Sequence, residues 1–138
     1  MTEGWLKAYL DAWNVHGDGK RETADAMVEA ASPDIRYADI NLPEPWLGHD
    51  GLRAACAGAS ALFPGLVVNI ETVVADGSSW AARWTMRAKH APTGKLFSGK
   101  GASFGTLGPD GKVNAHTDFW NPAHAGAQIG GPLIPSGE

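Results

Sequence analysis

The sequence has little cysteine, little clustered positive charge and no long apolar run. Cys56 is the only cysteine among 138 residues, which excludes an internal disulfide and a cysteine-based metal site. A single thiol fits a reducing compartment. Eleven Lys and Arg stand against fifteen Asp and Glu, and the longest cationic cluster is the pair Lys20 and Arg21. We therefore expect no nucleic-acid partner and no membrane-binding patch.

The N-terminus and the apolar runs predict neither targeting nor a membrane span. The first residues lack the basic and apolar stretches of a secretory signal. The apolar runs are a few residues long, whereas roughly 20 residues are needed to cross a bilayer. These absences favour a cytoplasmic location.

Length and composition predict one globular domain. At roughly 150 residues per domain, 138 residues make a single domain. Hydrophobic residues make up 43% and charged residues 19%, as in ordinary globular proteins. We place the domain at residues 1–130 and a C-terminal tail at 131–138. Six tryptophans are unusual in a chain of this length, and indoles both fill cores and line pockets.

The first half is predicted to be mainly helical. Apolar residues recur at helical spacing from Trp5 to Trp13, and a Gly-Asp-Gly turn at 17–19 ends that helix. Asp50 is placed to cap a later helix. The further expected elements are a helix at 21–31, a strand at 35–39, a proline-containing loop at 41–48 and a helix at 51–61.

The second half is predicted to be a meander of four strands. The expected strands are 66–75, 79–90, 96–107 and 112–120, separated by glycine-containing turns. Gly99, Gly101 and Gly105 lie within the third strand and suggest bulges or strong bending. From Asn121 onward we expect a tail on the surface. Helices followed by strands predict an α+β fold, in which bent strands curl around the helices and leave an apolar mouth.

Four short motifs follow one another along the chain. They are Tyr-Leu-Asp-Ala-Trp-Asn at 9–14, Phe-Pro-Gly-Leu at 63–66, Arg-Trp-Thr-Met at 83–86 and Asp-Phe-Trp at 118–120. Their order and spacing resemble the nuclear transport factor 2-like fold, and within it the SnoaL-like polyketide cyclases. The resemblance implies a cone-shaped α+β barrel with three N-terminal helices on a curved, mostly antiparallel sheet. It also implies a homodimer formed through the outer face of the sheet, and an enzyme that needs no cofactor.

Asp118 is the first candidate for the chemistry. Residues two apart on a strand share a face, so Asn114, His116, Asp118 and Trp120 are expected to point the same way. Burial among tryptophans predicts a raised pKa for Asp118, in the range useful to an acid/base. In the resembling cyclases an Asp here is the general acid/base of a ring-closing aldol step. His116 is a further catalytic candidate, because it could hydrogen-bond Asp118, fix its orientation or carry a proton itself. The structural alternative is an Asp bonded to an arginine or a backbone amide, with His116 a satisfied polar residue.

Asp39 is the second candidate. The run at 36–39 resembles the strand that supplies the general base of ketosteroid isomerases, and Tyr9 falls near the phenol that stabilises the oxyanion there. The second oxyanion donor of that family is an Asp, whereas Ser103 stands in its place here. The competing functions are therefore a double-bond isomerase that uses Asp39, or a non-catalytic module that binds small molecules. In the structural interpretation, Asp39 has no catalytic role and caps the turn before the proline-containing loop.

The remaining candidates are expected to bind a hydrophobic substrate, possibly aromatic or polycyclic. Flat substrates stack on indoles, and a carbonyl oxygen needs a hydrogen-bond donor. The candidates are Tyr9, Trp13, Trp46, Trp84, His90, Asn114 and Trp120. The five histidines show no metal-ligand spacing, so no metal site is predicted.

Overall fold

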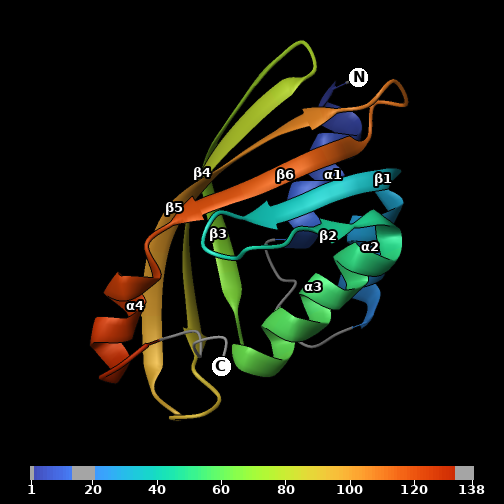
Figure 1. Cartoon of the computed structure of the whole chain (residues 1–138). Helices are drawn as coiled ribbons and strands as arrows, with labels where there is room; N and C mark the ends of the chain where they lie inside the picture. Colours follow the sequence, from blue (N-terminus) through green and yellow to red (C-terminus); the bar gives the residue numbers. More distant parts are fainter. Residues whose placement is uncertain (1, 14–20, 133–138) are drawn as a thin grey trace.

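The computed structural model describes residues 2–13 and 21–132, which form four helices and six strands (Figure 1). The helices are α1 (Thr2–Trp13), α2 (Arg21–Glu29), α3 (Gly48–Leu62) and α4 (Pro122–Ile129). The strands are β1 (Ala31–Asp39), β2 (Trp46–Leu47), β3 (Val67–Asp76), β4 (Ser79–Lys89), β5 (Leu96–Leu107) and β6 (Val113–Trp120). The predicted α+β class is confirmed.

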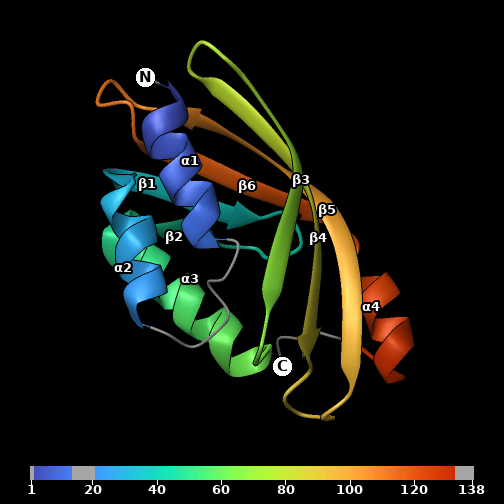
Figure 2. The ribbon, with the colours of Figure 1, turned by 180° about the vertical axis from the view of Figure 1, so that it is seen from behind.

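All six strands form one curved, open sheet. Its order is β2-β1-β6-β5-β4-β3, and only β1 and β6 run parallel. The predicted meander of four strands is β3 to β6. Helices α1, α2 and α3 cover the concave face, whereas α4 lies against the opposite face of β5 (Figure 2). Within the described residues, no helix is long and apolar enough to cross a membrane.

The core lies between the concave face and the three covering helices. Alternate residues of β4 point into it, so Trp80, Trp84 and Met86 are buried whereas Arg83 and Arg87 are exposed. Helix α1 contributes an apolar stripe at helical spacing. Its buried members are Leu6, Tyr9, Leu10 and Trp13.

Two glycines of β5 make room for two indoles of β4. Gly101 pairs with Trp84, and Gly105 pairs with Trp80. A Cβ on Gly105 would lie 2.5 Å from the Trp80 ring and 2.0 Å from the carbonyl oxygen of Ala115. A Cβ on Gly101 would lie 2.7 Å from the Trp84 ring. Of the predicted bulges or strong bending, the bulges were wrong, because the ladder between β4 and β5 has no irregularity. The glycines provide space for the rings.

Several element boundaries differ from the sequence-based expectation. Strand β1 begins at Ala31, not at residue 35, because it also pairs with the start of β6. Helix α2 accordingly ends at Glu29. The expected loop at 41–48 contains the short strand β2, which pairs with β1. The N-cap of α3 is Leu47, and Asp50 falls in the first turn instead of capping it. The predicted turn at 17–19 lies outside the described residues.

The segment after Asn121 is a helix, not the predicted surface tail. The Asn121 side chain accepts a hydrogen bond from the Ala123 amide and caps α4, and proline follows at the first helical position. Gly130 ends the helix with a φ of 85°. Ile129 is buried. These cap signals are visible in the sequence, so the helix could have been predicted. Of the proposed tail, residues 133–138 lie outside the described part of the chain.

Candidate active site

A cavity of about 270 Å³ lies between the concave face of the sheet and the helices. Most of its wall is aromatic or aliphatic, and two carboxylates interrupt it. The lining residues are Trp13, Tyr37, Asp39, Leu42, Trp46, Ala55, Gly58, Ala59, Leu62, Phe63, Leu66, Val68, Trp84, Met86, Asp118 and Trp120. All four tryptophans singled out in the sequence therefore lie in this wall.

Asp118 is held in the cavity wall by three side-chain donors. Its Oδ1 accepts from Ser103 Oγ and from His116 Nε2, each at 2.6 Å. Its Oδ2 accepts from the Tyr37 hydroxyl at 2.7 Å. Ser103 in turn accepts a hydrogen bond from Trp84 Nε1 at 2.9 Å. The carboxylate is thus fixed in one orientation, with both oxygens engaged.

His116 lies behind Asp118 and joins it to α1. The ionised carboxylate of Asp118 only accepts hydrogen bonds, so His116 Nε2 carries the hydrogen between them. Its Nδ1 is hydrogen-bonded to the Tyr9 hydroxyl at 2.7 Å. Both Tyr9 and His116 are fully buried, and neither belongs to the described lining of the cavity. Tyr9, predicted as a substrate-binding residue, therefore contacts His116 instead of lining the cavity.

The pKa of Asp118 is lowered, whereas the sequence argument predicted that it is raised. Burial does raise this pKa, but the attraction of His116 and the hydrogen bonds from His116, Ser103 and Tyr37 outweigh it. Burial alone predicts the wrong direction, because the donors that contact the carboxylate reverse its effect. Burial, and then the nearby charge of Asp118, raises the pKa of Tyr9 and Tyr37 well above that of an ordinary phenol. Both phenols therefore stay protonated, and Tyr37 donates to Asp118.

Asp39 lies beside Asp118 and also lines the cavity. The two residues are register partners on the parallel strands β1 and β6. Asp39 Oδ2 accepts from Trp120 Nε1 at 2.7 Å, and Oδ1 accepts from the backbone amide of Asn41 at 2.8 Å and from its side chain at 3.0 Å. Asp39 thus caps the turn after β1, as the structural interpretation predicted, and its carboxylate also lines the cavity.

Besides Tyr9, two further predicted pocket residues, Asn114 and His90, are not among the described residues that line the cavity. The β5–β6 ladder shifts register between Thr106 and Leu107, which breaks the alternation expected for β6. Asn114 consequently accepts a hydrogen bond from exposed Thr106 instead of sharing the face of His116. His90 is buried at the turn after β4, where its Nδ1 is hydrogen-bonded to Thr93 Oγ1 at 2.9 Å.

Tyr37 lines the cavity but was not among the predicted site residues. It shares a face of β1 with Asp39, so the same alternation that selected Asp39 would have selected it. Ser103 was considered only as a weak oxyanion donor. It is the register partner of Asp118 on β5, and its hydroxyl donates to that carboxylate.

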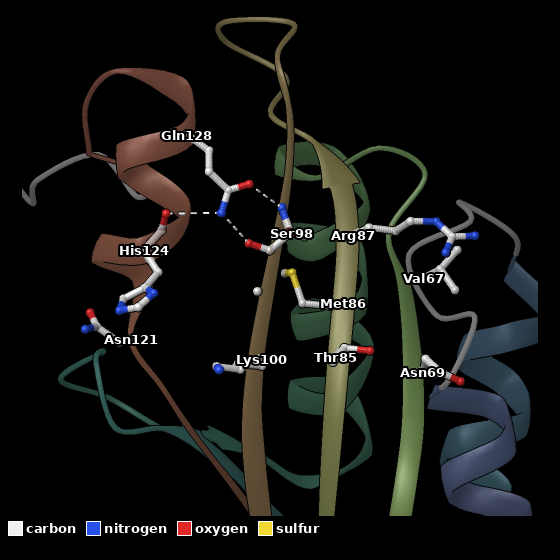
Figure 3. A pocket seen from close by; sticks show the side chains of 11 residues that line it. Val67, Asn69, Thr85, Met86, Arg87, Ser98, Lys100, Asn121, His124 and Gln128 are labelled. Atoms are coloured by element: carbon white, nitrogen blue, oxygen red, sulfur yellow. Dashed lines mark hydrogen bonds between the residues drawn. The ribbon is translucent and has the colours of Figure 1, made fainter.

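A second hollow, of about 540 Å³, lies on the other face of the sheet, along β3, β4 and β5 and beside α4 (Figure 3). Its charged side chains are Arg87 and Lys100, and Gln128 bridges its helix to both backbone groups of Ser98 (Figure 3). It is larger than the inner cavity, but neither Asp118 nor Asp39 is among its lining residues, so the inner cavity is the candidate active site. Among the described residues, no three His, Cys, Asp or Glu side chains group in a way that would hold a metal ion.

Most of the chain matches one protein family. The family model of the SnoaL-like domain matches residues 6–116, a stretch that ends two residues before Asp118. None of the curated proteins matches the sequence.

Three solved structures are similar over nearly the whole chain. A protein from Catenulispora acidiphila DSM 44928 with a ketosteroid isomerase-like fold, in complex with trimethylamine, has a TM-score of 0.80 at 16% identity, over 92% of this chain and 97% of that one. A protein from Jannaschia sp. CCS1, provisionally described as a SnoaL-like polyketide cyclase, has a TM-score of 0.76 at 19% identity, over 92% and 89%. IdmH from Streptomyces antibioticus, provisionally described as a polyketide cyclase, has a TM-score of 0.72 at 21% identity, over 94% and 99%. At these identities they establish the fold.

Proposed function

Because the chain belongs to the SnoaL-like domain family, we propose that it is an acid/base enzyme that closes a ring on a hydrophobic, carbonyl-bearing small molecule. One observation carries the proposal: the carboxylate of Asp118 is fixed in the wall of a cavity that is otherwise mostly apolar. Solved structures of similar fold that are described as cyclases support the reaction class, and the trimethylamine complex supports small-molecule binding.

The first step is removal of a proton from the carbon beside a carbonyl. Asp118 takes the proton, and the electron pair of the C–H bond forms the enolate, whose negative charge lies on the carbonyl oxygen. A lowered pKa makes Asp118 a weak base but keeps it ionised and ready. His116, held by Tyr9, fixes the position of the carboxylate and stabilises it.

The second step is carbon–carbon bond formation. The enolate carbon attacks a second carbonyl of the same molecule, which becomes an alkoxide and takes the proton back from Asp118. Atoms balance, because the product is an isomer of the substrate. Tyr37 is the phenol donor in the cavity wall and is placed to stabilise the enolate oxygen once Asp118 is protonated and no longer needs its hydrogen bond.

Exchange of carbon-bound hydrogen tests this proposal without the natural substrate. The probe is α-tetralone in D2O, followed by NMR, with wild type, Asp118→Asn, Asp39→Asn and the exposed control Asp11→Asn. We expect Asp118→Asn to lower exchange by roughly a hundredfold or more, the usual effect of a lost acid/base. The control retains the wild-type rate. Full exchange by folded Asp118→Asn contradicts the proposal.

The same experiment separates two alternatives. A double-bond isomerase that uses Asp39 requires Asp39→Asn, and not Asp118→Asn, to abolish exchange. The position of Asp39 in the cavity wall keeps this alternative open. A non-catalytic binding module would retain ligand binding in both variants, with no exchange above background in any of the proteins.

We also propose that the chain forms a homodimer through the outer face of the sheet. Phe104 and Phe119 pack edge to face there, with ring centroids 5.5 Å apart, and are 54% and 39% exposed. A second copy would cover these rings. Sedimentation of wild type and Phe104→Ser tests this: the dimer should weaken in the variant, and a monomeric wild type would contradict the proposal.

A further inference from the structure

We infer that the ligand of the inner cavity carries a cationic amine, which binds against Asp39 between the neighbouring indole rings. The inference rests on the proposed function in that it names the substrate class of the same cavity. It assigns to Asp39 the recognition of charge, and it leaves the proton transfer to Asp118.

The charge of the cavity wall is the first argument. None of the described residues that line the cavity is a lysine or an arginine, whereas two of them are aspartates. Asp118 has the imidazole of His116 beside it. Asp39 has only neutral donors, the Trp120 indole and Asn41, and it forms no ion pair among the described residues. A half-buried carboxylate without a cationic partner favours a ligand that brings one.

The proximity of the two aspartates is the second argument. They are register partners on adjacent parallel strands, which lie about 4.8 Å apart. Like charges on neighbouring strands repel each other and destabilise the pair. A cationic group bound between or beside the carboxylates relieves this repulsion, so the charge of such a ligand complements that of the cavity wall.

The aromatic wall is the third argument. Trp120 donates its indole N–H to Asp39, so the ring and the carboxylate are held next to each other. Trp46 stacks on Tyr37 with ring centroids 5.4 Å apart, and both line the cavity. Faces of indole and phenol rings attract ammonium groups, most strongly where water is excluded. A carboxylate within an aromatic wall is the chemistry that recognises an alkylammonium, since the methyl groups and the charge are both satisfied.

The arrangement also orients the ligand. An ammonium group at Asp39 places the remainder of an apolar molecule along the aromatic wall toward Asp118 and Tyr37. The carbonyl would then lie where those two side chains act. The outer hollow has the opposite character, because its charged side chains are Arg87 and Lys100. Cation preference is therefore a property of the inner cavity.

A pair of probes of the same shape tests the inference. (4-Hydroxyphenyl)trimethylammonium carries the charge, and 4-tert-butylphenol is its neutral counterpart. Binding is measured by calorimetry with wild type, Asp39→Asn and Asp50→Asn, in which the control removes an exposed charge outside the cavity. We expect the cation to bind wild type the more tightly of the two, although the neutral probe is the more hydrophobic. Asp39→Asn should weaken the cation by roughly tenfold or more and leave the neutral probe unchanged.

Three results would overturn the inference. Equal or tighter binding of the neutral probe, no measurable binding of the cation, or an unchanged preference in Asp39→Asn overturns the inference. If Asp39→Asn does not fold, the salt dependence of wild type decides: the affinity of the cation should fall as salt rises, while that of the neutral probe does not. Binding of either probe is measured without any catalytic reaction. If wild type does not prefer the cationic probe but its exchange of α-tetralone depends on Asp118, only this inference fails. If wild type prefers the cationic probe but catalyses no exchange, only the proposed function fails.

Discussion

The hydroxyl of Tyr9 and Nδ1 of His116 are 2.7 Å apart and join α1 to β6 across 107 positions of sequence. The bond fixes the ring that holds Asp118, because Nε2 of the same histidine contacts the carboxylate. Tyr9 is therefore a positioning residue, and its role can be separated from that of the residues in the cavity wall.

Replacement of Tyr9 by phenylalanine should lower the free energy of unfolding by about 1–3 kcal/mol, because a buried ring nitrogen loses its partner. Urea unfolding measures this loss, and Asp11→Asn, in an exposed ion pair, should change stability by no more than about 0.5 kcal/mol. We further expect slower α-tetralone exchange with unchanged probe affinity. An unchanged rate would show that His116 needs no support from α1.

Tyr37→Phe should reduce turnover and leave ligand binding almost intact. If Tyr37 stabilises the enolate oxygen, its loss lowers kcat by roughly a hundredfold. Loss of its hydrogen bond also raises the pKa of Asp118, which strengthens the base. An equal or faster rate, with the acid limb of the pH profile moved to higher pH, would mean that Tyr37 only lowers the pKa of Asp118 and does not stabilise the enolate.

The stability conferred by ionised Asp118 should disappear in acid. Its pKa is lower in the folded chain than the ordinary value of about 3.9. The contribution is therefore complete above about pH 4 and is lost as the pH falls through the lower, folded pKa. The difference in unfolding free energy between wild type and Asp118→Asn, measured from pH 7 to pH 2.5, should shrink only at the acid end. A difference that shrinks between pH 7 and pH 5 would indicate a raised pKa.

Gly105→Ala should destabilise the protein by about 1–3 kcal/mol, as overpacking does, because its methyl group would collide with Trp80 and with the Ala115 carbonyl. Gly4→Ala is the matched control. Its new methyl group meets nothing within 4 Å on helix α1, so it should stabilise by up to about 1 kcal/mol. Thermal unfolding of the two variants should therefore shift in opposite directions.

Cys56 should be almost inert toward iodoacetamide in the folded protein. Burial raises the pKa of its thiol to about 11, with a partial opposing effect of Arg53. At pH 8 roughly a thousandth of the thiol is ionised, and the thiolate is the reactive form. Mass spectrometry should detect alkylation only after unfolding. Rapid labelling of the native protein would contradict this burial.

Much of the fold could be predicted from local patterns. Glycine-containing turns separate four apolar-rich segments, and this spacing leaves little choice but a meander of strands. Alternation along a strand also placed His116 and Asp118 on one face, as the structure has them. Helix α4 was missed although its caps, Asn121 and Gly130, are local signals, because the Pro- and Gly-rich steps after it were interpreted as a loop.

The site itself depended on contacts that local patterns do not contain. Alternation failed at Asn114 because the ladder with β5 shifts register there, which depends on the partner strand. The pKa of Asp118 was predicted in the wrong direction because two of its donors come from other strands: Tyr37 is 81 positions away and Ser103 is 15. The sequence by itself determined the order of the first three helices, of strand β1 and of the four-strand meander, and the face on which Asp118 lies. Only the tertiary structure decided that acid's charge and partners, because hydrogen bonds between distant segments form when the chain has folded.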